Sequence, residues 1–138
     1  MTLRQSHVIQ LTISCPIDRA LSFLADPLNF PKWAAVVGPM TQIGPQEWLA
    51  QTEFGERIIR FCVANEFGIF DHAVFRDGDE PIMLPLRVTP NEDGCDLTFV
   101  FFRRQGLSDE QFASAIEWVT NDFLTLRALL EFEPQRSS

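Results

Sequence analysis

The chain has 138 residues, of which 46% are hydrophobic and 22% are charged, as expected of one globular domain that buries its own core. Its formal net charge of −8 argues against nucleic acid or an anionic membrane surface as partners, because binding to phosphate groups needs concentrated positive charge. No apolar stretch approaches the roughly 20 residues of a membrane-spanning helix, and the first residues form no apolar signal segment, so we expect a cytoplasmic protein without membrane insertion.

The N-terminal part of the chain predicts one strand followed by two short helices. Residues 7–14 alternate between two faces, as in a half-buried strand. Pro16 is favourable in the first turn of a helix, and this helix should end at Asp26, because the next residue is a proline and disfavours helical backbone before it. A second short helix is expected over residues 28–35, with Asn29 or Asp26 as its cap.

Residues 40–104 carry apolar side chains at every second position, which predicts six further strands. Turn-forming residues, such as those at 91–94, separate these strands, and the short connections predict an antiparallel meander. Pro81 and Pro85 indicate that one strand lies at an edge or contains a bulge. The six predicted strands span residues 40–43, 47–54, 57–64, 67–75, 82–89 and 96–104.

Residues 108–132 predict a long amphipathic helix. Ser108 and Gln111 have the spacing of a capping box, and Asp109 and Glu110 place negative charge at the positive end of the helix dipole. At ~1.5 Å per residue the helix would be about 37 Å long, so it needs a large apolar surface to lie on. Its apolar residues are three or four positions apart and therefore form one stripe, which consists of Phe112, Ile116, Val119, Phe123, Leu126 and Leu130.

The order strand, two short helices, six strands and long helix predicts an α+β fold, in which a curved antiparallel sheet of about seven strands has the long helix over its concave face. Four sequence blocks accompany this order: residues 15–33, Asp71-His72, residues 87–91 and residues 126–131. With these blocks the chain resembles the START/Bet v 1-like (SRPBCC) superfamily, the helix-grip fold that includes polyketide cyclase/dehydrase-like and lipid-binding proteins. The resemblance implies a single domain over residues 1–138, and we expect residues 1–6 and 134–138 to be loose termini.

The resemblance also implies a cavity for a small hydrophobic ligand between the sheet and the C-terminal helix. The thirteen Phe and three Trp residues, with no Tyr, fit either an aromatic-walled cavity or a Phe-rich solid core. The candidate ligand-binding residues lie on the expected inward strand faces, on the long helix, or at the pocket mouth in the case of Trp33, and each of them could equally belong to the core. They are Trp33, Trp48, Phe54, Phe61, Val63, Met83, Phe99, Phe101, Val119 and Phe123.

Asp71, His72 and Arg87 are the candidate catalytic residues. Asp71 and His72 are neighbours in a predicted strand, so at most one of them points squarely into the cavity, and the flanking residues do not decide which. A histidine on an apolar wall could move a proton near neutral pH, or it could be a structural residue held by Asp71 or Arg87. Arg87 is either a surface arginine paired with a carboxylate or, if the proline bulge reverses its face, a ligand for a carboxylate or enolate.

Three functions therefore stay open. The first is binding of a lipid-, polyketide- or aromatic-like molecule in the cavity. The second is a cyclase, dehydratase or isomerase that uses His72 or Asp71 as proton shuttle and Arg87 to stabilise an enolate. The third is a non-catalytic interaction module with a filled pocket, for which Trp118 and Leu124, off the main helix stripe, would fit a homodimer contact.

The sequence contains no motif that indicates metal binding, phosphate binding or a nucleophilic serine. Cys15, Cys62 and Cys95 are widely spaced, which predicts reduced thiols, and the two histidines at 7 and 72 do not form a metal-ligand cluster. The sequence contains neither a glycine-rich phosphate loop nor a Gly-x-Ser-x-Gly nucleophile motif. We therefore expect no metal and no cofactor.

Overall fold

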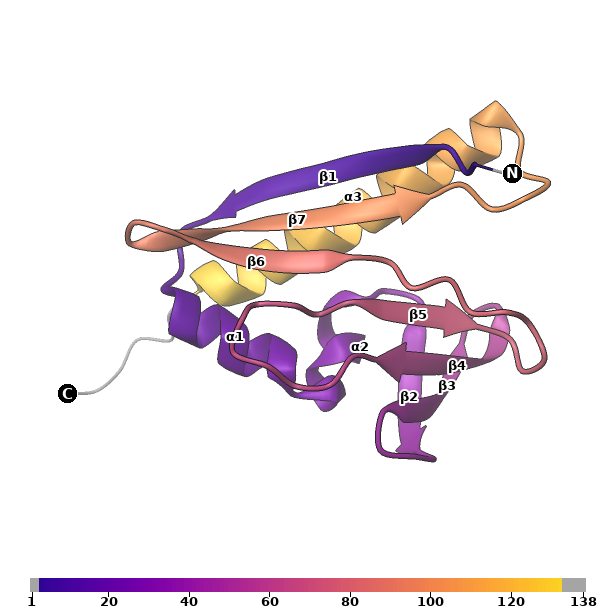
Figure 1. The fold of residues 1–138 in the computed structure, drawn as a ribbon, viewed down its shortest axis with the longest axis horizontal. Helices are drawn as coiled ribbons and strands as arrows, with labels where there is room; N and C mark the ends of the chain where they lie inside the picture. The colour runs from indigo at the N-terminus through magenta and orange to yellow at the C-terminus, as the bar shows by residue number, and fades with distance from the viewer. Residues whose placement is uncertain (1–2, 133–138) are drawn as a thin grey trace.

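The computed structural model describes residues 3–132, and these follow the predicted order of elements (Figure 1). One strand leads into a group of short helices, six strands follow, and a long helix ends the described chain. The elements are β1 (Ser6–Ile13), α1 (Ile17–Ala25), the 3-10 helix η1 (Pro27–Asn29), α2 (Phe30–Trp33), β2 (Val37–Gln42), β3 (Glu47–Thr52), β4 (Gly55–Phe61), β5 (His72–Phe75), β6 (Leu86–Asn91), β7 (Gly94–Phe102) and α3 (Asp109–Glu131).

The strands of the described residues form two antiparallel sheets, with the orders β1-β7-β6 and β2-β3-β4-β5. The sheets meet where residues 68–72, which lead into β5, lie beside residues 84–88, which lead into β6 (Figure 1). The backbone N–H of Phe70 donates to the carbonyl of Leu86 at 2.8 Å across this join. The predicted curved antiparallel sheet of about seven strands is therefore confirmed, with an interruption of the ladder at the join.

The strand predicted over residues 82–89 lies inside this arrangement and not at an edge. β6 begins only at Leu86, because Pro85 has no N–H for the ladder. The Pro85 carbonyl still accepts the N–H of Val100 at 3.0 Å on the β7 side. On the other side an isolated bridge pairs Arg87 with Ile69. The proline thus marks the interruption between the two sheets.

The short helical segments form as their turn residues predict. The carboxylate of Asp26, one of the two expected caps, accepts the N–H of Leu28 at 3.0 Å and begins η1. Helix α2 ends at Trp33, two residues earlier than predicted, because Ala34 has an extended backbone with ψ 99°. Helix α2 lies beside β2 of the four-stranded sheet, whereas α1 follows β1 directly and packs against β6 and β7 of the three-stranded sheet (Figure 1).

Helix α3 lies along the three-stranded sheet, with β1, β7 and β6 in front of it in Figure 1. The predicted capping box is present, because Ser108 Oγ accepts the N–H of Gln111 at 3.1 Å and Gln111 Oε1 accepts the N–H of Ser108 at 2.9 Å. The predicted stripe faces the sheet, and four of its residues are buried: Phe112, Phe123, Leu126 and Leu130.

Side chains fill the space between α3 and the three-stranded sheet. The Phe123 ring is 1% exposed and lies 4.9 Å from the ring of Phe99, centroid to centroid. Trp33 of α2 stacks on Phe123 at 5.3 Å, and Leu97 and Leu126 are fully buried. Burying each such side chain contributes about 1.5–3 kcal/mol, so this layer is the core of the protein.

The N-terminal segment is ordered over more of its length than predicted. Ser6 is already part of β1, and the Gln5 carbonyl accepts the N–H of Arg103 at 2.8 Å, so the expectation of a loose segment through residue 6 is wrong for these two residues. Residues 1–2 and the predicted C-terminal tail lie outside the described residues. No helix in the described part of the chain is long and apolar enough to cross a membrane.

Candidate functional site

A cavity of about 390 Å³ opens beside the short helices. One wall comes from the end of α1 and from η1 and α2, and the other comes from the loops and strand ends around β3, β4 and β5. Most of the wall is aromatic or aliphatic. The lining consists of residues 23–27, Phe30, Trp33, residues 45–46, Trp48, residues 61–64, residues 69–72 and Leu86.

This cavity does not lie between the sheet and the long helix, where the fold prediction places it. No residue of α3 is among the described residues that line it. Trp33 lines the cavity and also stacks on Phe123, so its ring separates the cavity from the core beneath α3. The predicted location is wrong because the rings of Phe99 and Phe123 occupy that space.

Four of the ten predicted ligand-binding residues line the cavity. Phe30, which was not predicted, organises two of them: its ring lies 4.9 Å from that of Trp33 and 5.6 Å from that of Phe61, both edge to face. The strand alternation had indicated Phe61 and Trp48 correctly as inward-facing residues. The four residues are Trp33, Trp48, Phe61 and Val63.

The other six predicted residues do not reach the cavity. Phe54 is 65% exposed, because β3 ends at Thr52 and places Phe54 in the following turn, where its ring lies 6.3 Å from that of Trp118. Met83 is also exposed. The remaining four are in the core or pack against it, and these are Phe99, Phe101, Val119 and Phe123.

His72 is the buried polar residue of the site. Its ring lines the cavity and lies 5.4 Å from the ring of Phe30 and 5.9 Å from that of Phe99. Its Nδ1 is 3.0 Å from the carbonyl oxygen of Phe70, to which it donates a hydrogen bond. Burial lowers the pKa of His72, although this hydrogen bond and the charge of Asp71 act in the opposite direction. The imidazole is therefore neutral at neutral pH, with the proton on Nδ1.

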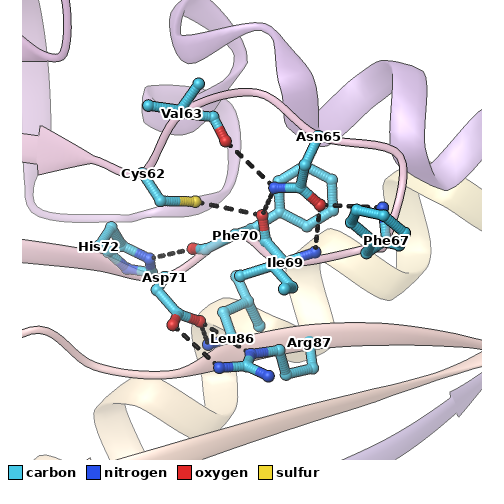
Figure 2. A network of polar contacts seen from close by, with 10 residues as sticks. All are labelled: Cys62, Val63, Asn65, Phe67, Ile69, Phe70, Asp71, His72, Leu86 and Arg87. Carbon is cyan, nitrogen blue, oxygen red and sulfur yellow. Dashed lines mark hydrogen bonds and ion pairs between the residues drawn. The ribbon is translucent and has the colours of Figure 1, made fainter.

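The Asp71 carboxylate turns toward β6 and binds Arg87. Arg87 Nε and Nη2 donate to its two oxygens at 3.0 and 3.1 Å (Figure 2). The hydrogen bond to Asp71, together with its negative charge, raises the pKa of Arg87. Leu86 and Val88 on either side are buried, so Arg87 is the surface arginine of the first alternative, and it is not among the residues that line the cavity.

Asp71 and His72 together replace one backbone hydrogen bond at the join between the sheets. In a regular ladder the N–H of Leu86 would donate to the carbonyl of Phe70. Instead, the N–H of Leu86 donates to Asp71 Oδ1 at 3.0 Å, and the Phe70 carbonyl accepts from His72 (Figure 2). Side chains thus satisfy both backbone groups that this interruption leaves without a backbone partner. The Asp-His pair, noticed in the sequence for its chemistry, has this structural role as well.

The loop between β4 and β5 depends on Asn65, which the sequence analysis did not single out. Asn65 Oδ1 accepts the N–H groups of Phe67 at 2.9 Å and Ile69 at 3.2 Å. Its Nδ2 donates to the carbonyls of Val63 at 3.1 Å and Ile69 at 2.8 Å (Figure 2). One side chain therefore closes the loop at the cavity mouth.

Gly68 is the second residue on which the conformation of this loop depends. The sequence pattern that could have predicted the loop is Asn65 followed by Gly68, between two predicted strands. The φ of Gly68 is 76°, in the left-handed region. A Cβ at this position would lie 2.1 Å from the carbonyl oxygen of Val88. The backbones of Gly68 and Val88 are therefore too close for any residue other than glycine at position 68.

The charges around the cavity are negative. Asp26 and Asp71 line it, and none of the described lining residues is Lys or Arg. Burial raises the pKa of the Cys62 thiol, and the charge of Asp71 acts in the same direction, so Cys62 stays protonated and donates to the carbonyl of Ile69 at 3.2 Å. The site is thus a mostly apolar cavity that is lined by two acidic residues and by the neutral imidazole of His72.

The described architecture has clear counterparts among solved structures. A START superfamily protein from Mycobacterium smegmatis matches with a TM-score of 0.73 and 12% identity over 91% of this chain and 97% of that chain. The Bet v 1 allergen Ara h 8.0201 matches with a TM-score of 0.66 and 13% identity over 93% and 98% of the two chains. This chain has the START/Bet v 1-like fold.

A third helix-grip structure, the Aha1 dimer from Colwellia psychrerythraea, matches with a TM-score of 0.72 and 11% identity over 93% of this chain and 97% of that chain. No protein-family model and no curated protein sequence matches this chain. At such low identities the likeness concerns the fold alone, so the function has to be argued from the site.

Proposed function

We propose that this helix-grip protein binds a small, mostly apolar molecule of lipid-, polyketide- or aromatic-like character in the cavity beside α1 and α2. The observation that carries this proposal is the cavity itself. Its volume of about 390 Å³ lies within the range of roughly 300–1,000 Å³ that is typical of small-molecule sites. Its wall is mostly aromatic and aliphatic, with few polar groups.

Exposed apolar residues at the cavity mouth support the same function. Val63 lines the cavity and is 68% exposed, and Phe67, in the loop closed by Asn65, is 74% exposed. Leu28, next to the lining residue Pro27, is exposed as well. Exposed apolar side chains beside a cavity are typical of ligand- or partner-binding surfaces. They offer an apolar route into the cavity.

The enzymatic alternative has less support. Asp71 accepts hydrogen bonds from Arg87 and Leu86, and Arg87 lies outside the lining, so the pair is engaged in structure and not placed as proton shuttle and enolate ligand. Of the three candidate catalytic residues, His72 lines the cavity without taking part in this ion pair. The filled-pocket alternative is disfavoured by the cavity volume.

Native mass spectrometry of the freshly purified chain tests the proposal. A mass excess that is lost on denaturation would identify a ligand that co-purifies with the protein. Val63→Trp places an indole in the cavity mouth and should lower ligand occupancy several-fold, whereas Val8→Trp makes the same change on the exposed face of β1 and should not. Equal occupancy in both variants would place the ligand elsewhere and overturn the assigned site.

If the wild-type protein carries no ligand, the neutral dye Nile red replaces it in a fluorescence titration. Saturable binding that Val63→Trp weakens and Val8→Trp does not would support the proposal. Absence of saturable binding would refute it.

We also propose a cytoplasmic location and a homodimer. The free thiols of Cys62 and Cys95 support a reducing compartment. The dimeric state of the Aha1 structure and the exposed contact between Phe54 and Trp118 support self-association through this surface. Light scattering coupled to gel filtration should report a dimer for the wild type and a monomer for Trp118→Glu, with Leu28→Glu as a control on another exposed apolar residue. A monomeric wild type would refute the dimer.

A further inference from the structure

We propose that the ligand of this cavity is an uncharged molecule that carries a hydrogen-bond donor, such as a hydroxyl or phenol group, and that His72 Nε2 accepts this hydrogen bond. The inference rests on the proposed binding function and names the chemistry of the molecule bound.

The hydrogen bond of His72 defines which tautomer its ring adopts. Nδ1 is committed to the Phe70 carbonyl at 3.0 Å, and a carbonyl oxygen accepts only, so Nδ1 must bear the proton. The neutral ring then has a lone pair and no proton at Nε2. Nε2 can accept a hydrogen bond from a ligand but cannot donate one.

The accessibility of Nε2 is the second step. Nδ1 is the only ring nitrogen of His72 with a hydrogen-bond partner among the described residues. In the same part of the chain no fully buried side-chain nitrogen or oxygen lacks a partner. Nε2 is therefore not sealed into the core, although the residue as a whole is only 6% exposed. Because His72 lines the cavity, the open side of Nε2 is the cavity.

The charges of the lining exclude an anionic ligand, and this is the third step. The charged residues of the described lining are Asp26 and Asp71, and this lining contains no Lys or Arg to balance a ligand carboxylate. Arg87, the cation next to Asp71, is held by that carboxylate with two hydrogen bonds. A fatty acid or another carboxylate would lose its hydration without gaining a cationic partner.

Three molecules with one skeleton test the inference by isothermal titration calorimetry: 2-naphthol, 2-methoxynaphthalene and 2-naphthoate. The hydroxyl compound can donate to Nε2, the methyl ether cannot, and the carboxylate adds negative charge. Leaving a buried acceptor without its partner costs about 1–3 kcal/mol, so 2-naphthol should bind about tenfold or more tightly than the ether. The carboxylate should bind more weakly than 2-naphthol.

His72→Phe removes the acceptor and keeps an aromatic ring, so it should reduce the preference for 2-naphthol over the ether to about one. His7→Phe is the matched control, because His7 is exposed on β1 and should leave the preference unchanged. Nitrogen-15 spectra of the wild-type His72 ring give a measurement that needs no variant. They should show a proton on Nδ1, a bare Nε2, and a shift of the Nε2 resonance with 2-naphthol but not with the ether.

The outcomes separate this inference from the proposed function. Equal affinities of 2-naphthol and its ether, or a proton on Nε2 in the free protein, would overturn the donor assignment and leave binding intact. Tighter binding of 2-naphthoate would overturn the exclusion of anions. If none of the three compounds binds and Nile red does not bind either, the proposed binding function itself fails.

Discussion

Replacing Asp71 by alanine should lower the free energy of unfolding by more than the loss of its ion pair with Arg87 alone would. Asp71→Ala removes the ion pair with Arg87 and also the acceptor for the N–H of Leu86 at the join between the two sheets. Asp71→Asn removes the charge but keeps an oxygen that can accept from Leu86. Comparing the two variants therefore separates the charge from the backbone hydrogen bond.

The expected losses in the free energy of unfolding follow from the exposure of Arg87 and Leu86. The Arg87 side chain is 49% exposed, so the ion pair contributes at most about 1 kcal/mol. Leu86 is 1% exposed, and an N–H left without a partner there costs about 1–3 kcal/mol. Asp71→Ala should thus lower the free energy of unfolding by about 1–4 kcal/mol, whereas Asp71→Asn should lower it by about 1 kcal/mol or less.

Urea denaturation at neutral pH measures both values. Asp79→Ala is a matched control, because Asp79 forms an exposed ion pair with Arg76 at 3.1 Å without a buried N–H, and it should change stability by less than about 0.5 kcal/mol. If Asp71→Ala costs no more than Asp79→Ala, the Phe70 carbonyl has accepted the N–H of Leu86 in addition to His72, and the reasoning about the join is refuted.

Two further variants test other parts of the structure. Partial burial raises the pKa of Asp122 from 3.8 to about 6, so its charge disfavours folding increasingly as the pH rises through this window. Asp122→Asn, which keeps an acceptor for the N–H of Ala35, should be about 1–2 kcal/mol more stable than wild type near pH 7 and no more stable near pH 4. An equal difference at both pH values in urea denaturation would contradict this. Gly68→Ala should lower the free energy of unfolding by about 3 kcal/mol or more, because the added Cβ would contact the Val88 backbone. Gly78→Ala should lower it by only about 1 kcal/mol, because a Cβ there meets no atom within 4 Å. Equal melting temperatures of the two variants would argue against the close approach of Gly68 to Val88.

The location of the cavity could not be predicted from the sequence. Phe61 and Trp48 were recognised as inward residues from strand alternation alone. Phe99, which shows the same strand alternation, and Phe123, on the apolar stripe of α3, belong to the core instead, because their environment depends on how α2 meets α3. The stacking of Trp33 on Phe123 joins residues 90 positions apart, and no local pattern predicts such a contact.

The helices and strands of this protein, their order and its fold class could be predicted from its amino-acid sequence. Periodicity, the capping box at Ser108 and the turn residues are local properties, and they are readable because each depends on a few neighbouring residues. Both strand faces near Asp71 and His72 are apolar, so their orientations were visible only in the folded chain, where the His72 ring packs among the core rings and the Asp71 carboxylate binds Arg87. The location of the cavity was likewise decided by packing between distant segments, in which each side chain occupies the volume that others leave.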